Sequence, residues 1–162
     1  EIGKRKQALM HLKKAYKYAQ ELKLKERLYD CQFEEIEHLL LVKNLKEAKR
    51  LFQKLFTELK DETDATLRLS LFIYMGRVCS ALGLFKNAQE YFEEALNITE
   101  KLPDNYFTGK IYYFLGLNYK SQNKYPEALQ FFLKANEIFT KIGNLLYLDK
   151  IENEISSADI SK

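Results

Sequence analysis

The chain has 162 residues, of which 46% are hydrophobic and 14% aromatic, a composition that excludes a disordered segment and suffices for one continuous core. Its formal net charge of +3 is too close to neutral to indicate nucleic-acid binding. No stretch approaches the ~18 consecutive apolar residues that a membrane helix requires. We therefore expect no direct contact with nucleic acid and none with a membrane.

Apolar residues recur at helical spacing with a period of 40 residues. The clearest unit lies at 72–95, where two amphipathic segments are separated by Gly83. Two columns of the repeat run through the whole chain: Ala8, Ala48, Ala88 and Ala128, and beside them Leu12, Phe52, Phe92 and Phe132. Small residues opposite aromatic ones predict antiparallel helical hairpins, and a fixed period of this size indicates a solenoid.

The predicted elements in chain order are an orphan second helix at 4–23, hairpins at about 27–60, 64–101 and 105–142, and a closing helix at about 145–157. We expect seven main helices, no strand and a single array over residues 1–162. Because the chain begins inside a second helix and without Met, we interpret it as a fragment of a longer protein. The apolar side of residues 8–19 would then lack its cover, which predicts that the fragment forms a homodimer through that side or packs it against a neighbour in a crystal.

Turn chemistry supports these boundaries. Residues 61–64 supply capping side chains for the next helix, and residues 102–105 form a turn in which Pro103 stops the preceding helix. Pro126 falls in the first turn of a helix, where its missing N–H costs little. Gly143 is expected just after a helix end, and Asn144 at the start of the closing helix.

The histidines and cysteines fit packing better than chemistry. His11 falls in the column of Leu51 and Phe131, which predicts a packed side chain rather than a ligand. Cys79 falls in the column of Tyr119 and is expected in the core. Two unrelated cysteines in a helical array favour a reducing compartment, so we predict a cytoplasmic protein.

The sequence offers no catalytic motif. The densest polar cluster comprises Glu34, Glu35, Glu37 and His38, which we interpret as a solvated helix face rather than a metal or acid–base site. No phosphate-binding loop, nucleophile elbow or zinc-binding helix motif is present in the sequence. We expect a protein that is not an enzyme, with no catalytic residue, no metal ligand and no cofactor.

Charge is uneven along the chain. Residues 1–27 contain nine lysines and arginines against three acids. Such a basic helix could face an anionic partner or a neighbouring domain. The simpler interpretation is a solvated helix face.

Two units carry a family signature: Phe72-x2-Met75-Gly76-x2-Cys79…Ala88-x3-Phe92-x2-Ala95, and Tyr112-x2-Leu115-Gly116-x2-Tyr119…Ala128-x3-Phe132-x2-Ala135. The pattern resembles the tetratricopeptide family, W-x2-L-G-x2-Y…A-x3-F with a following Ala. The resemblance implies an all-α fold, a right-handed superhelical solenoid of antiparallel helical hairpins. The first hairpin departs from the pattern, because Ile36 stands where the signature has glycine.

Units of 40 residues are longer than the ~34 residues of standard tetratricopeptide units. They look like the units in peptide-pheromone receptors of the PlcR and NprR type and in kinesin light chain. The former resemblance implies the effector domain of a transcriptional regulator in Gram-positive bacteria, which takes part in quorum sensing.

The family also implies a concave groove on the first helices of the hairpins. Carried over to this sequence, the candidate ligand-binding residues are Phe33, Glu37, Leu40, Ile73, Arg77, Lys110, Tyr113, Leu117, Lys120 and Asn153. Acids lie toward one end, bases toward the other, and apolar residues between them. We expect a peptide to be held by burial at the centre and charge at its ends, with Arg77, Lys110 and Lys120 on an anionic group. The alternative is that these positions merely tolerate solvent.

The sequence thus predicts a non-enzymatic module that binds a peptide or protein in the groove. It would be the ligand-sensing domain of a cytoplasmic regulator, such as a peptide-responsive transcriptional regulator. The alternative is a general protein–protein scaffold or dimerisation module without a small peptide ligand.

Overall fold

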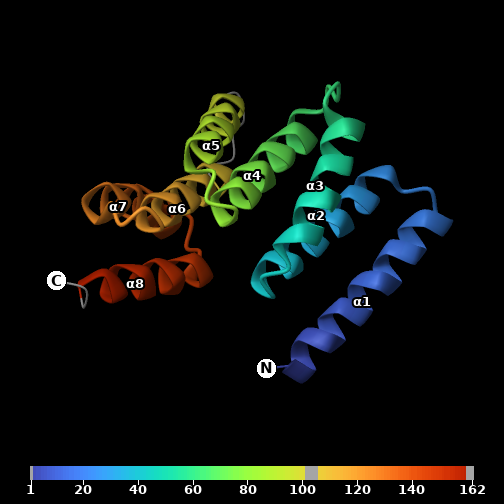
Figure 1. Cartoon of the computed structure of the whole chain (residues 1–162), viewed down its shortest axis with the longest axis horizontal. Coiled ribbons are helices and arrows are strands. Elements are labelled where there is room, and N and C mark those ends of the chain that lie inside the picture. The colour runs from blue at the N-terminus through green and yellow to red at the C-terminus, as the bar shows by residue number, and fades with distance from the viewer. Residues whose placement is uncertain (1, 101–105, 160–162) are drawn as a thin grey trace. The chain divides into compact units, whose positions relative to one another are not determined.

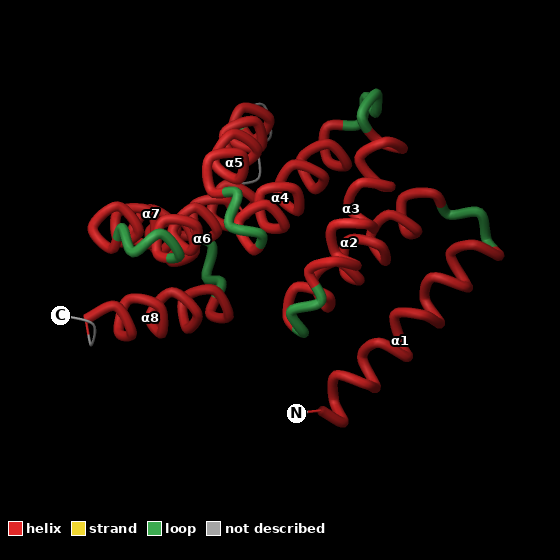
Figure 2. Tube along the Cα trace, in the orientation of Figure 1, coloured by secondary structure: helices red, strands yellow, loops and turns green. Residues whose placement is uncertain are grey.

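The computed structural model describes residues 2–100 and 106–159. Within these ranges the chain is helical throughout, with short turns and no strand (Figures 1 and 2). The helices are α1 (Ile2–Glu21), α2 (Lys25–Leu41), α3 (Leu45–Leu59), α4 (Ala65–Ala81), α5 (Phe85–Thr99), α6 (Tyr106–Lys120), α7 (Tyr125–Lys141) and α8 (Leu145–Asp159). The all-α fold class is therefore confirmed.

The described part of the chain contains eight helices, which are the seven expected main helices and the closing helix α8. With 15 residues, α8 is as long as α3, α5 and α6. Helix boundaries fall within two residues of those expected from the sequence. The predicted turn at 102–105 lies outside the described residues.

The chain forms two compact units, Glu1–Leu82 and Gly83–Lys162. In the first unit α1 packs against α2, α2 against α3 and α4, and α3 against α4 (Figure 1). The largest fully buried side chains of this unit are Ile36, Leu55, Leu59, Leu69, Ile73, Met75 and Val78. Ile36 is fully buried, so the residue that departs from the glycine signature lies in the core.

In the second unit α6 packs against α5 and α7, and α7 also packs against α8. Aromatic side chains fill its core, and the largest fully buried ones are Phe92, Phe132 and Phe139. Phe92 packs against Phe114 with ring centroids 6.3 Å apart. Ala88 and Ala128 of the small column are also buried, as the repeat predicts. The side chain of Ala8, in the same column, lies outside the described residues.

The predicted helix caps are confirmed. Asp64 precedes α4, and its Oδ1 accepts a hydrogen bond from the backbone N–H of Leu67 at 2.8 Å. Asn144 does the same for α8, accepting from the N–H of Tyr147 at 3.2 Å. Pro126 lies in the first turn of α7. The Asp64 and Asn144 side chains satisfy N–H groups that the first turn of a helix leaves without a partner.

A left-handed backbone residue recurs in the turns with the repeat period. Lys43, Gly83 and Asn123 follow α2, α4 and α6 with φ of 57°, 76° and 61°. Gly143 follows α7 with φ of 69°, as its expected place after a helix end requires. Glycine adopts this conformation without strain, whereas lysine does not.

The histidine and cysteine predictions had different outcomes. Cys79 is buried, as expected. His11 is exposed, so the prediction that it packs in the core is wrong. In the equivalent column Phe131 stacks on Tyr119 of the preceding helix, but no described helix precedes α1 to cover His11. None of the described helices combines the length and the apolar character needed to span a membrane.

Candidate functional site

The predicted groove residues lie on the first helices of the hairpins, α2 and α4 in one unit and α6 and α8 in the other. In the first unit, Arg77 of α4 donates a hydrogen bond to the Glu37 carboxylate of α2 and forms an ion pair with it. The side chains are 15% and 30% exposed. The Arg77 guanidinium also lies 5.4 Å from the ring centroid of Tyr74. Arg77 is thus engaged within the fold rather than held ready for a ligand.

Two apolar groove candidates of this unit are in the core, which corrects the expectation that they contact a ligand. Phe33 is 4% exposed and stacks on Tyr74 with ring centroids 5.0 Å apart. Ile73 is 1% exposed. The physical reason is that α2 and α4 pack side by side and cover this column. Leu40 remains half-buried.

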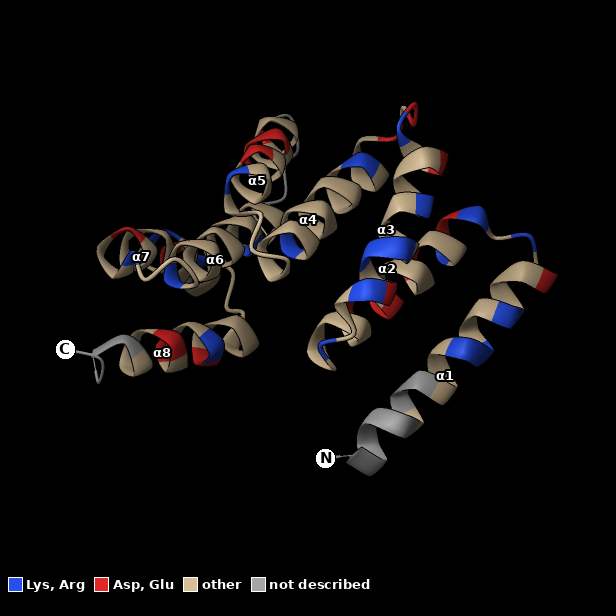
Figure 3. Cartoon of the chain, in the orientation of Figure 1, with Lys and Arg blue, Asp and Glu red and all other residues tan. Residues whose placement is uncertain are grey.

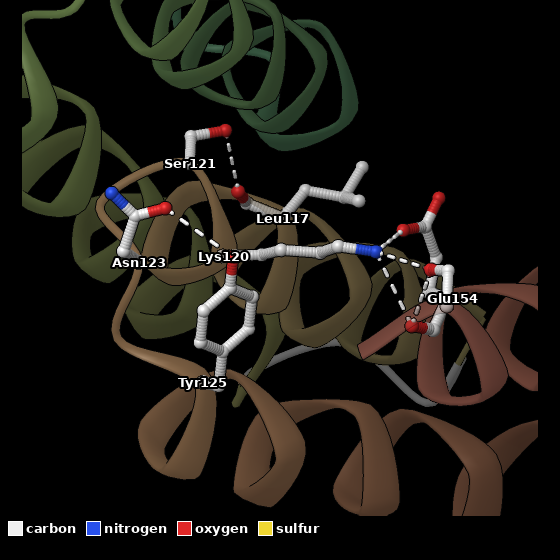
Figure 4. Close-up of polar contacts among 7 residues, drawn as sticks. Leu117, Lys120, Ser121, Asn123, Tyr125 and Glu154 are labelled. Atoms are coloured by element: carbon white, nitrogen blue, oxygen red, sulfur yellow. Dashed lines mark hydrogen bonds and ion pairs between the residues drawn. The ribbon is translucent and has the colours of Figure 1, made fainter. Parts of the chain in front are cut away.

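In the second unit, Lys120 of α6 reaches α8 (Figure 4). Its Nζ donates to Glu154 Oε2 at 2.7 Å, to the Glu154 carbonyl at 3.3 Å and to Ser157 Oγ at 2.6 Å. The Lys120 and Glu154 side chains remain 24% and 28% exposed. Leu117, one turn earlier on α6, is half-buried. In this part of α6 and α8, the ion pair between Lys120 and Glu154 connects the two helices, and Leu117 lies one turn away on α6. All three side chains are partly accessible.

Three further candidates belong to these two helices. Lys110 of α6 lies over the ring of Tyr106, 5.6 Å from its centroid. Asn153 of α8 is exposed, and its Nδ2 donates to the carbonyl of Asp149 at 2.8 Å. Tyr113, by contrast, is 8% exposed. Its ring meets that of Tyr147 of α8 edge-on at 5.5 Å, so the expected ligand contact through Tyr113 is corrected.

Sequence reasoning missed Glu154 and Ser157, the partners of Lys120. A signal was available, because both lie within one turn of Asn153, which the sequence did place on this surface. Lys150, which the groove columns of the sequence also include, lies over the Tyr147 ring at 4.8 Å from the centroid. We call Lys110, Leu117 and Lys120 together with Lys150, Asn153, Glu154 and Ser157 the α6–α8 face.

The described residues contain no group of three His, Cys, Asp or Glu side chains that could hold a metal ion. Both cysteines are buried free thiols. Burial raises the pKa of the Cys79 thiol, and burial followed by the charges of Asp30 and Glu34 raises that of Cys31. A raised thiol pKa is the opposite of what a nucleophilic cysteine requires.

Comparison with known proteins bears on the fold. Residues 66–141 match the family model described as the tetratricopeptide repeat. The crystal structure of BtubC (BKLC) from P. vanneervenii is similar, with a TM-score of 0.68 and 15% sequence identity, over 97% of this chain and 66% of that one. This chain thus spans about two thirds of that protein's length, and at this identity the likeness concerns the fold alone. No curated protein matches the sequence significantly.

These comparisons support the tetratricopeptide repeat type. They do not show a resemblance to the PlcR and NprR receptors. Proteins built from such repeats are generally non-catalytic scaffolds that mediate protein–protein interactions. The helices, their small-against-aromatic packing and the matched residues agree: this chain has a helical-repeat fold of the tetratricopeptide type.

Proposed function

We propose that the protein is a non-enzymatic binding module that holds a short extended peptide segment on the α6–α8 face. The observation that carries the proposal is the pair of Lys120 and Glu154, each about a quarter exposed and joined across two helices beside the half-buried Leu117. A preorganised polar pair next to an apolar side chain provides both orientation and burial for a bound segment.

Charge supports an anionic group on the ligand. Lys110, Lys120 and Lys150 contribute three cations to the face, and Glu154 contributes one anion. Glu154 already pairs with Lys120, so a bound carboxylate would share the Lys120 ammonium group with Glu154. Lys110 and Lys150 would also attract the bound carboxylate. Leu117 would bury an apolar side chain of the same segment.

We place this module in a cytoplasmic regulator whose activity responds to the bound peptide, such as a transcriptional regulator. The support is the resemblance of its 40-residue units to those of bacterial peptide-pheromone receptors. The coding sequence upstream of Glu1 tests this part. A helix-turn-helix segment there is the expected result, whereas further helical repeats would favour a plain scaffold.

A second candidate function is dimerisation, favoured by large apolar side chains on α1 and the turn after it. Met10 is 48% exposed, Tyr18 61% and Leu22 67%. Apolar side chains exposed in this way favour association. Light scattering after size exclusion should give twice the monomer mass for the wild type and the monomer mass for Tyr18→Glu. A monomeric wild type at high concentration would refute dimerisation.

The main proposal is tested by selecting peptides from a displayed random library on the full chain and titrating the selected peptide. Lys120→Glu should weaken binding at least tenfold. Lys141→Glu is the matched control, because Lys141 also pairs with an acid, Glu137, at 2.6 Å, but on α7. The control should stay within twofold of the wild type. Equal affinity in both variants, or no selected peptide, would refute the α6–α8 face as the binding site.

A further inference from the structure

A cavity lies in the first unit where α1, α2 and α3 meet, apart from the α6–α8 face. Its volume is about 260 Å³. That is smaller than the ~300–1,000 Å³ of small-molecule sites, so it suits one or two side chains rather than a cofactor. None of its lining residues belongs to the α6–α8 face, so it is independent of the function proposed above.

The cavity has an apolar floor and a charged rim. Leu51 and Cys31 are buried at its floor, and Leu12 is half-buried. Tyr16 of α1 contributes a half-buried ring and a hydroxyl group. Such a floor accepts an apolar side chain, whose burial would supply most of the binding free energy.

Three cations from two helices surround this floor: Lys13 of α1 and both Arg50 and Lys54 of α3. Figure 3 shows lysine and arginine along both helices. Arg50 pairs with Glu47 within α3, and Lys54 lies 3.7 Å from Glu58. Both pairs are exposed and join neighbours on one helix, so each is weak and exchangeable for a ligand anion.

One acid, Glu35 of α2, also lines the cavity. The pKa of Arg50 is raised first by its hydrogen bond to Glu47 and also by the charge of Glu35, which lies within electrostatic reach. The three lining cations outnumber this acid, so the rim attracts an anionic group. The apolar floor favours an anion that carries an apolar stem, which inorganic phosphate lacks.

We propose that the cavity between α1, α2 and α3 is a docking site for an acidic peptide segment of a protein partner. One apolar side chain of the segment enters between Leu12 and Leu51, and a neighbouring carboxylate lies against Lys13, Arg50 and Lys54. The positive charge of residues 1–27 steers such a segment toward this end of the chain.

The probe is a fluorescein-labelled peptide, Glu-Asp-Phe-Leu-Asp-Glu, titrated against the full chain by fluorescence polarisation. We expect saturable binding that is lost when lysine replaces the acids and weakened at least fivefold when alanine replaces Phe and Leu. No binding at 1 mM peptide, on the order of the weakest specific affinities, would overturn the proposal, as would equal binding of the lysine peptide.

Substitutions of two residues that line the cavity localise the site, because they should change the peptide affinity in opposite directions. Lys13→Glu should weaken binding at least tenfold, whereas Glu35→Gln should strengthen it about two- to threefold by removing the repelling charge. Lys46→Glu, an exposed change on α3 outside the cavity, is the matched control and should stay within twofold. Unchanged affinity in Lys13→Glu, with native circular dichroism, would overturn the proposal.

A competition experiment distinguishes a peptide carboxylate in the cavity from a bound phosphate. Inorganic phosphate at the same concentration as the peptide should not displace it. Displacement by phosphate would overturn the assignment of a carboxylate and indicate a phosphate site. Loss of peptide binding in Lys120→Glu but not in Lys13→Glu would move the peptide to the α6–α8 face and overturn this second site.

Discussion

Gly116 of α6 lies directly against the ring of Phe132 of α7. A Cβ atom built on Gly116 would be 2.5 Å from Cε1 and 2.6 Å from Cδ1 of that ring. Phe132 is 1% exposed and cannot turn into solvent. This contact explains in physical terms why the signature has glycine on one helix and an aromatic residue on the next.

Substitution of Gly116 by alanine should therefore destabilise the protein. Overpacking a filled core costs about 1–3 kcal/mol, which outweighs the gain of ~1 kcal/mol in helix propensity from Gly to Ala. Urea unfolding should show a lower midpoint for Gly116→Ala. Gln130→Ala, an exposed change on α7, should leave the midpoint nearly unchanged. A more stable Gly116→Ala variant would refute the close contact.

Lys43 holds a left-handed conformation at the position where the next repeat has Gly83. Replacing Lys43 by glycine removes a steric cost of ~1–2 kcal/mol and adds an entropic cost of ~0.5–1 kcal/mol, a net gain of roughly 0.5–1 kcal/mol. Thermal unfolding should show a Tm higher by ~1–4 °C. The control, Lys49→Gly inside α3, should lower Tm, because glycine weakens a helix interior.

The ion pair between Glu37 and Arg77 should contribute to stability. Changing Glu37 to glutamine removes a carboxylate that pairs with the mostly buried Arg77 guanidinium, at an expected cost of about 1–2 kcal/mol. Glu34→Gln, an exposed change on the same helix, is the control. In a double-mutant cycle with Arg77→Met, the two losses should be less than additive. Strict additivity would show that the pair is not coupled.

Both thiols have a pKa raised mainly by burial, so stability should fall at alkaline pH. The folded-state pKa lies above the unfolded value of ~8.5, so this contribution is complete below that value and is lost as pH rises through the folded pKa. Cys79→Ala should therefore lose less stability than the wild type between pH 7 and 10, measured by urea unfolding. An identical loss in both proteins would contradict the assignment.

The helices could be predicted from the sequence because the small and aromatic columns repeat with a fixed period. Asp64, Pro126 and Asn144 marked helix starts, and the structure confirms each of them. The repeat could not predict exposure at the start of the array. His11 shares a column with packed residues, yet no described helix covers it.

The candidate site was less predictable than the fold. The columns placed Tyr113 and Ile73 on the first helices correctly, but periodicity along one helix does not reveal how far the neighbouring first helix covers it. The pairing of Lys120 with Glu154 depends on how α6 and α8 pack, which one sequence does not encode as a pattern. Of the charged groove candidates, Arg77 pairs with another candidate, Glu37, whereas Lys120 pairs with Glu154, which the columns did not include.

The peptide site on the α6–α8 face is tested most directly by nuclear magnetic resonance of the full chain labelled with ¹⁵N. The measurement maps which amide chemical shifts change when the selected peptide binds. A peptide site on the α6–α8 face predicts that the changes concentrate in α6 from Lys110 to Lys120 and in α8 from Lys150 to Ser157. Weak or absent changes there, with large changes confined to other helices, would contradict a peptide site on the α6–α8 face.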